Sequence, residues 1–204
     1  MFLQPSKPSR RSRRASRGFT LIELVVVVLI VGISAALATP TLAGQVRERR
    51  SRDTAQRIAQ LYSVARMRAL GRGGAVVVSY NSASGFTVRE SILGAAALDP
   101  TCSNQPGMGC LTNAWGNPAS TRVVTTLVPL AELTVTARDQ GAVARTQMDI
   151  CFTPMGRSFI SFNGSAPTNA MVGATTVEVQ RTGTGTGLLR TVAILPNGMA
   201  RLGL

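Results

Sequence analysis

The feature that most constrains this chain is an apolar run from Phe19 to Ala38, FTLIELVVVVLIVGISAALA, which holds a single charge, Glu23. An α-helix needs about twenty predominantly apolar residues to cross the hydrocarbon core of a bilayer. The run therefore predicts a membrane-spanning helix. Basic residues precede it, and positive charge beside a span stays on the cytoplasmic side, so we expect the chain beyond the span to be exported.

The positive charge of the chain is concentrated near the N-terminus. The formal net charge is +13, from 22 Lys and Arg against 9 Asp and Glu. The first 18 residues hold six bases and no acid, residues 47–72 hold eight arginines and two acids, and the chain from 73 onward carries only +2. A nucleic-acid-binding domain usually presents a strongly basic face, so this distribution disfavours a DNA-binding head.

Residue types that enzymes rely on are scarce. The chain has no histidine, which excludes a Ser-His-Asp relay and imidazole metal ligands, and three cysteines are too few for a structural zinc site without histidine. The acids considered as catalytic groups are scattered without a motif: Asp99, Glu132, Asp139, Asp149 and Glu178. We expect no catalytic residue, no metal site and no cofactor.

Beyond the span, the spacing of apolar residues predicts that the helix continues. Small and apolar residues recur at three- and four-residue intervals on one face: Ala55, Ile58, Leu61, Tyr62, Ala65 and Ala69. This stripe is expected to pack on a sheet, and Gly71, Gly73 and Gly74 are expected to end the helix. The chain then divides into a basic leader (1–18), a transmembrane and stem helix (19–72) and a β-rich head (73–204).

After the glycines the period changes to two, which is typical of strands. A hairpin is expected from 75–80 and 86–90, and the further strand candidates are 122–127, 133–138, 147–153, 158–162, 175–181, 188–195 and 199–202. The stretch from Gly94 to Ser120 has turn residues without periodicity and is interpreted as a long loop. The predicted fold class is α+β, with a long N-terminal helix packed on an antiparallel head.

The segment Arg17-Gly18-Phe19-Thr20-Leu21-Ile22-Glu23, followed by the apolar helix, resembles the type IV prepilin processing motif. The resemblance implies that a prepilin peptidase cuts after Gly18 and that Phe19 is then N-methylated. It also implies that Glu23, costly in a bilayer, pairs with the cationic N-terminus of a neighbouring pilin-like subunit. The alternative for Glu23 is a carboxylate that snorkels to the interface.

Two other interpretations of the N-terminal region stay open. Pro40 removes a backbone donor and clashes with the preceding turn, so it is expected to kink the helix or to mark a place that melts when packed into a filament, although a simple irregularity at the membrane exit is the alternative. The segment could also be an ordinary secretory signal, uncleaved or cut near Ala43 after the loosely matching sequence Ala38-Thr39-Pro40-Thr41-Leu42-Ala43.

The head is similar to the family of H-type minor pseudopilins and FimT. The similarity lies in Cys151-Phe152-Thr153-Pro154-Met155-Gly156-Arg157 and in the terminal strand Thr191–Leu195 leading to Asn197-Gly198. It implies a minor pseudopilin of a type II secretion pseudopilus, anchored in the bacterial inner membrane with a periplasmic head, whose partners are other pilin-like subunits and secreted cargo. Some FimT-like members of type IV pili capture DNA through a Gly-Arg-x-Arg turn; here the stretch reads Gly198-Met199-Ala200-Arg201, so only Arg190 and Arg201 are weak DNA-contact candidates.

The cysteines on the exported side allow a disulfide. Cys102 and Cys110 are eight residues apart in the expected loop, so a local bond between them is plausible on the oxidising side of the membrane. A pairing that uses Cys151 is the rival. The run from Gly183 to Gly187 lacks the Lys-Ser/Thr of a phosphate loop and is interpreted as a hairpin tip.

Overall fold

The computed structural model describes residues 19–93, 105–107, 109–111, 114–162, 164–182 and 187–203, without the side chains of 37–44 and 47. The chain divides into two compact units, Met1–Gly44 and Gln45–Leu204. The first unit holds the N-terminal part of a long helix, and the second holds the rest of that helix and the strands of the described residues. Gly18 and Cys102, both named above, lie outside the described residues.

The helix α1 runs from Leu21 to Arg72, 52 residues, and includes Pro40. At its C-terminal end Gly73 takes a positive φ of 70° and donates its N–H to the carbonyl of Ala69 at 3.1 Å. A left-handed residue just past the last turn is favourable for glycine, so the predicted stop is confirmed and falls at Gly73 rather than Gly71. Among the described residues, no helix combines the length and the apolarity required of a membrane span.

The strands of the second unit form two antiparallel sheets. The six-stranded sheet has the order β3-β2-β1-β6-β7-β8 and the five-stranded sheet the order β11-β10-β9-β4-β5. The bounds in the first are β1 Val76–Asn81, β2 Gly85–Ser91, β3 Thr121–Leu127, β6 Gln147–Phe152, β7 Ser158–Ser161 and β8 Asn169–Ala170. In the second they are β4 Leu133–Arg138, β5 Ala144–Arg145, β9 Thr175–Arg181, β10 Arg190–Ile194 and β11 Ala200–Gly203.

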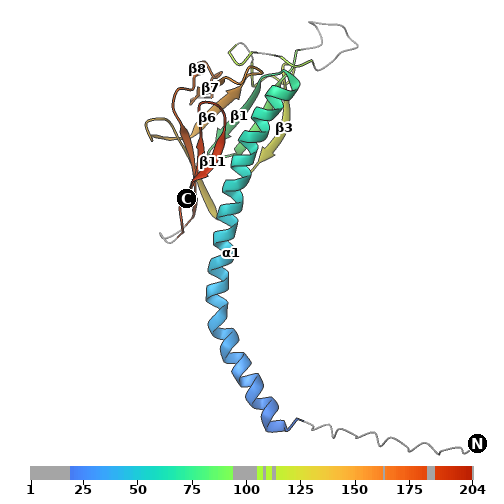
Figure 1. Ribbon diagram of the computed structural model, residues 1–204, viewed down its shortest axis with the longest axis vertical. Coiled ribbons are helices and arrows are strands. Elements are labelled where there is room, and N and C mark those ends of the chain that lie inside the picture. The colour runs from blue at the N-terminus through green and yellow to red at the C-terminus, as the bar shows by residue number, and fades with distance from the viewer. Residues whose placement is uncertain are drawn as a thin grey trace, which may run out of the picture. The chain divides into compact units, whose positions relative to one another are not determined.

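One apolar core joins the outer part of α1 to both sheets. Every residue of the predicted helix stripe is buried: Ala55, Ile58, Leu61, Tyr62, Ala65 and Ala69. They pack with alternate residues of β1, such as Val76 and Val78, and with Val177 and Ile194 of the five-stranded sheet. Figure 1 shows the C-terminal part of α1 lying along strands β1 and β3. The stripe therefore holds the stem helix to the head, as the period of its apolar residues predicted.

The α+β fold with an antiparallel head is confirmed, and most strands lie within one or two residues of their predicted bounds. The two-residue strands β5 and β8 were missed, because a pair of residues is too short to show a period. The division into two sheets was also not predicted. A hydrogen bond links the two sheets: the hydroxyl of Tyr80 in β1 donates to the carbonyl of Val135 in β4 at 2.5 Å.

Candidate functional site

The residue predicted to be methylated, Phe19, lies directly ahead of the first turn of α1. Thr20 precedes the helix and caps it, because its Oγ1 accepts the backbone N–H of Glu23 at 3.3 Å and its carbonyl accepts that of Leu24 at 3.2 Å. Phe19 is 78% exposed. The residue that a peptidase would leave as the new N-terminus therefore stands outside the helix, two residues before its first turn begins.

Glu23 lies in that first turn, where the positive end of the helix dipole favours a carboxylate. Its side chain is exposed and forms no ion pair with any residue that the structure describes. Residues three apart, Thr20 and Glu23, have the spacing of a capping box, so local capping explains why the helix starts here. It does not supply a cationic partner for the carboxylate.

The residues that follow are apolar on all sides of the helix. Large exposed side chains between Leu21 and Ile33 are Leu21, Ile22, Leu24, Val25, Val26, Val27, Val28, Leu29, Ile30, Val31 and Ile33. Isolated exposed apolar residues are normal, but a continuous apolar surface of this kind marks a site that contacts lipid or another protein. Pro40 falls among the residues whose side chains are not described, so its predicted role in bending stays a prediction.

Where the stem helix meets the six-stranded sheet, a buried carboxylate collects three arginines. Glu90 of β2 is fully buried, and its oxygens lie 2.9 Å from Arg68, 2.8 Å from Arg72 and 3.1 Å from Arg122. Burial acts to raise the pKa of Glu90, but the hydrogen bonds from Arg68 and Arg122 and the nearby positive charges outweigh it, so the pKa lies below its usual value. The cluster locks the last turns of α1 to β2 and β3.

This cluster was not predicted from the sequence, although the sequence contains a signal for it. Period two places Glu90 on the same face of its strand as Phe86 and Val88, which are buried in the core. An acid at a core-facing position requires a partner, and Arg68 and Arg72, four residues apart on one helix face, are suitable. The pairing itself depends on how helix and sheet meet, which the sequence does not state.

The stem is also tied to the five-stranded sheet, and this affects the two arginines considered as DNA contacts. Arg190 lies 2.6 Å from Glu48 of α1 and its side chain is 13% exposed. Arg201 pairs in register with Ala193, whereas Arg190 shares its face with Val192 and Ile194. The two arginines therefore lie on opposite faces of the sheet and do not meet, because alternate residues of a strand point to opposite sides.

The two head segments that carry the family resemblance lie against each other. In the first, which joins β6 to β7, the Thr153 hydroxyl accepts the N–H of Arg157 at 3.1 Å and Gly156 has a φ of 77°. In the second, which joins β10 to β11, Gly198 also has a φ of 77°, and a Cβ there would approach the Phe152 ring within 2.9 Å. Glycine at 198 is thus required both by conformation and by close packing.

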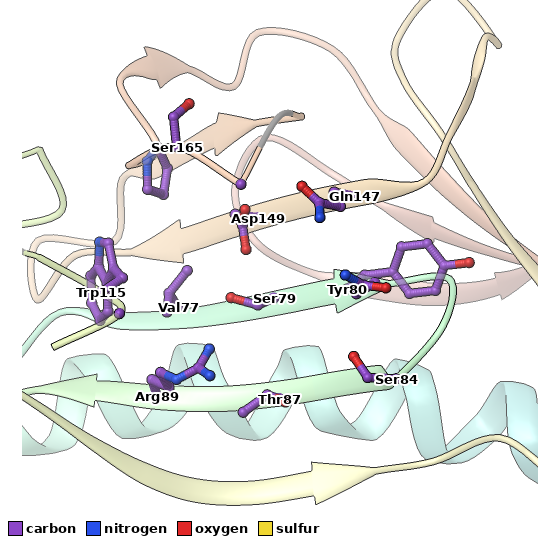
Figure 2. A pocket seen from close by; sticks show the side chains of 14 residues that line it. Val77, Ser79, Tyr80, Ser84, Thr87, Arg89, Trp115, Gln147, Asp149 and Ser165 are labelled. Carbon is purple, nitrogen blue, oxygen red and sulfur yellow. The ribbon is translucent and has the colours of Figure 1, made fainter. Parts of the chain in front are cut away.

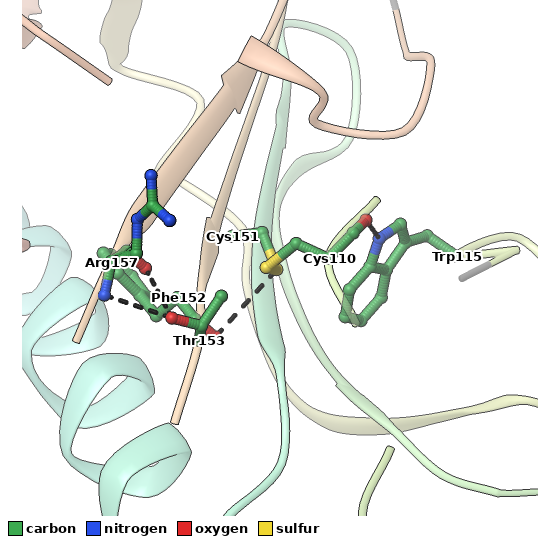
Figure 3. Close-up of a disulfide and its surroundings, with 6 residues drawn as sticks. All are labelled: Cys110, Trp115, Cys151, Phe152, Thr153 and Arg157. Atoms are coloured by element: carbon green, nitrogen blue, oxygen red, sulfur yellow. Dashed lines mark hydrogen bonds between the residues drawn. A yellow bond between two sulfur atoms is a disulfide. The ribbon is translucent and has the colours of Figure 1, made fainter. Parts of the chain in front are cut away.

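The disulfide of the structure joins Cys110 to Cys151, with the Cα atoms 6.0 Å apart (Figure 3). The expected local bond between Cys102 and Cys110 is therefore replaced by the rival pairing. The reason is tertiary: Cys151 lies in β6 on the face opposite the main core, and the loop that contains Cys110 packs onto that face beside Ala75 and Val77. A separation of eight residues suggested a local bond, but the fold of the sheet brings Cys151, 41 residues along the chain, to Cys110.

The acids considered as catalytic groups are not gathered in one place in the described part of the chain. Three form ion pairs: Glu132 with Arg50, Glu178 with Arg138, and Asp139 with Arg145. Asp149 is buried on the six-stranded sheet, and Asp99 lies outside the described residues. Within the described part of the chain, no three His, Cys, Asp or Glu residues gather closely enough to hold a metal ion.

The N-terminal segment also stands out in comparison with known proteins. Residues 13–39 match the family described as "Prokaryotic N-terminal methylation motif", and this segment includes Gly18, Phe19 and Glu23. The chain thus carries a prokaryotic N-terminal methylation motif at the start of a long helix, ahead of an antiparallel β head. No curated protein matches the chain.

Two solved structures are similar in fold, both of the type IV minor pilin FimU from Pseudomonas aeruginosa (strain PAO1). The crystal form in space group P21 is 16% identical, covers 75% of this chain and 87% of that chain, and has a TM-score of 0.42. The form in space group P65 is 15% identical, covers 75% and 92%, and has a TM-score of 0.41.

Proposed function

We propose that this chain is a minor pseudopilin, a non-enzymatic structural subunit of a type II secretion pseudopilus. The observation that carries the proposal is the coincidence of the methylation motif at residues 13–39 with a helix that begins at Leu21 and exposes apolar side chains on all sides. A chain with this start is cut after Gly18 by a prepilin peptidase, and Phe19 is methylated.

The apolar first part of α1 then serves two environments in turn. Before assembly it anchors the chain in the bacterial inner membrane, with the leader in the cytoplasm and the head in the periplasm. On assembly the same surface packs against the helices of other pilin-like subunits. The exposure of these side chains supports both steps, because an apolar surface that is exposed in the single chain is available to lipid and then to a neighbouring helix.

Glu23 acts in assembly under this proposal. A carboxylate in an apolar environment costs several kcal/mol unless it is paired or protonated, and the described residues offer it no cation. The methylated amino group of Phe19 in a neighbouring subunit supplies that charge. Pairing the two groups sets the depth at which each new subunit enters the filament.

A DNA-binding minor pilin of a type IV pilus is the second function considered, and the head supports it less. The candidate arginines are separated on two faces of a sheet, and Arg190 is already neutralised by Glu48. Sequence-independent DNA binding requires several unpaired cations on one surface. Secretion therefore remains the proposed role, with cargo or tip subunits contacting the head.

The processing step is tested by expressing the full chain with and without a prepilin peptidase and measuring the mature N-terminus by mass spectrometry. We expect N-methyl-Phe19 only when the peptidase is present, and no cleavage in a Gly18→Val variant. Gly32→Val is the matched control, because a side chain at Gly32 meets no atom within 4 Å. An intact N-terminus, or cleavage near Ala43, would overturn the proposal.

The choice between secretion and DNA uptake needs a cellular test. Deleting the gene in its own bacterium should reduce the export of secreted enzymes and leave the uptake of labelled DNA unchanged. Complementation with Glu23→Val should restore processing of the subunit but not secretion. Normal secretion together with loss of DNA uptake would assign the chain to a type IV pilus instead.

A further inference from the structure

The face of the six-stranded sheet that points away from the main core holds a polar cavity of about 250 Å³ (Figure 2). Its floor is set by the register of three strands. Ser79 of β1 lies between Thr87 of β2 and Asp149 of β6, and Gln147 lies two residues before Asp149 on the same face. Hydroxyl, carboxylate and amide groups therefore alternate across neighbouring strands on one surface.

One charged group of each sign lines the cavity. Arg89 pairs with Val77 in register, so it lies two strands away from Asp149, and these two described residues form no ion pair with each other. Asp149 is only 9% exposed. Its burial raises the pKa of its carboxyl, while a hydrogen bond from Ser79 and the charge of Arg89 oppose the rise.

The end wall is Trp115, and it is held in place by the disulfide. Its indole N–H donates to the carbonyl of Cys110 at 3.1 Å, and Cys110 is bonded to Cys151 of β6 (Figure 3). The ring packs against the small cluster that contains Val77. Because its single N–H is already used, Trp115 offers the cavity only the carbon surface of its ring.

These features together select one ligand chemistry. Asp149 disfavours a phosphate or carboxylate, and the polar floor disfavours an apolar molecule, since buried polar groups must keep hydrogen-bond partners. A ring that carries hydroxyls at its rim and C–H groups on its face satisfies both the floor and Trp115. The volume is slightly below the roughly 300–1,000 Å³ of pockets for drug-sized ligands, which suits a single ring.

We propose that this cavity, formed by Ser79, Thr87, Arg89, Trp115, Gln147 and Asp149, binds a neutral monosaccharide unit, either free or at the end of a glycan. This inference does not depend on which filament the chain joins. It assigns to the head a recognition surface on the face opposite the one that packs on α1.

Trp115 is the single tryptophan of the chain, so its emission reports on the cavity directly. The full chain, held in a zwitterionic detergent that contains no sugar, is titrated with glucose, galactose and N-acetylglucosamine, each free and as the methyl glycoside. We expect a saturable change in Trp115 emission for at least one sugar, with half-saturation at ~1 mM, as for weak single-ring ligands. Equal binding of the glycoside indicates the end of a glycan, and preference for the free sugar indicates a small solute.

Two substitutions test the floor of the cavity. Asp149→Asn should weaken binding about tenfold, because it removes a charged hydrogen-bond acceptor, and Asp53→Asn on the exposed side of α1 should change nothing. Thr87→Val, which keeps the shape of the side chain, should weaken binding about threefold and serves if Asp149→Asn does not fold. Circular dichroism and a thermal midpoint verify folding of each variant.

Several results would overturn the proposal. They are the absence of a saturable response to any sugar in the folded chain, a response to sodium phosphate or glycine that exceeds the response to sugars, and equal affinities for the wild type and both floor variants.

Discussion

The two parts of α1 use apolar side chains in opposite ways. Between Leu21 and Ile33 the apolar residues face all directions and stay exposed, whereas between Ala55 and Ala69 they recur on one face and are buried in the head. The second pattern is that of a helix folded onto its own chain. The first pattern leaves an apolar surface exposed, so its role must be sought in a membrane or in other subunits. In this helix, the exposed apolar residues rather than the buried ones therefore indicate a functional surface.

The largest expected difference comes from making the same substitution in both parts of the helix. Ile58→Ala should lower the free energy of unfolding of the head by about 2–5 kcal/mol, because Ile58 is fully buried. Ile30→Ala should leave it within about 0.5 kcal/mol, because Ile30 is 57% exposed. Urea denaturation of the full chain, followed by Trp115 fluorescence, measures both. Equal losses would show that the first part of α1 also contributes to the stability of the head.

The disulfide provides a second test of what stabilises the head. Reductant should lower the free energy of unfolding by about 2–4 kcal/mol, because Cys110 and Cys151 close a loop with a sequence separation of 41. Cys102→Ala should respond to reductant as the wild type does, and the double change Cys110→Ala with Cys151→Ala should not respond at all. If Cys102→Ala abolished the response, the pairing in the structure would be wrong.

A third comparison uses two glutamates, one from each region. Glu90→Gln should cost about 2 kcal/mol, less than for a fully buried pair because its arginines are 29–41% exposed. Glu23→Gln should leave the head unchanged. Since the pKa of Glu90 is lowered on folding, its contribution is complete above the ordinary value of 4.5 and is lost as the pH falls through the lowered value.

The lowered pKa of Glu90 predicts how the stability of the head depends on pH. The wild type should lose stability on going from pH 5 to pH 3, and the Glu90→Gln variant should lose measurably less over the same range. Urea midpoints at each pH give the result. Parallel curves for the two chains would mean that Glu90 is not ionised against its arginines.

The smallest expected effect concerns glycine. Gly198→Ala should cost about 1–2 kcal/mol, because a φ of 77° is strained for alanine and the new Cβ would approach Phe152 and Arg66. Gly32→Ala should not lower the stability of the head, since alanine favours a helix and meets no neighbour there. A stable Gly198→Ala variant would show that the turn after β10 can relax away from the stem.

Periodicity accounted for most of the secondary structure. Strands β4 and β9 have their predicted bounds, and the buried stripe of α1 was predicted residue by residue, because a side-chain period is a local property of the sequence. The pairing of strands into sheets is not a local property of the sequence. Nothing in the sequence stated that Thr121–Leu127 and Leu133–Arg138, separated by five residues, belong to different sheets.

The residues of the candidate site can likewise be separated into those predicted locally and those that depend on tertiary contacts. The order of Gly18, Phe19 and Glu23 ahead of an apolar helix is contained within one short segment, so the sequence by itself determined the processing motif, the stem helix and its buried face. Only the tertiary structure decided that Cys110 bonds Cys151, that Arg190 is neutralised by Glu48, and that Glu90 collects its arginines. These contacts join residues from 18 positions apart, for Arg72 and Glu90, to 142 positions apart, for Glu48 and Arg190. Such separations close only when helix and sheets bury their common core.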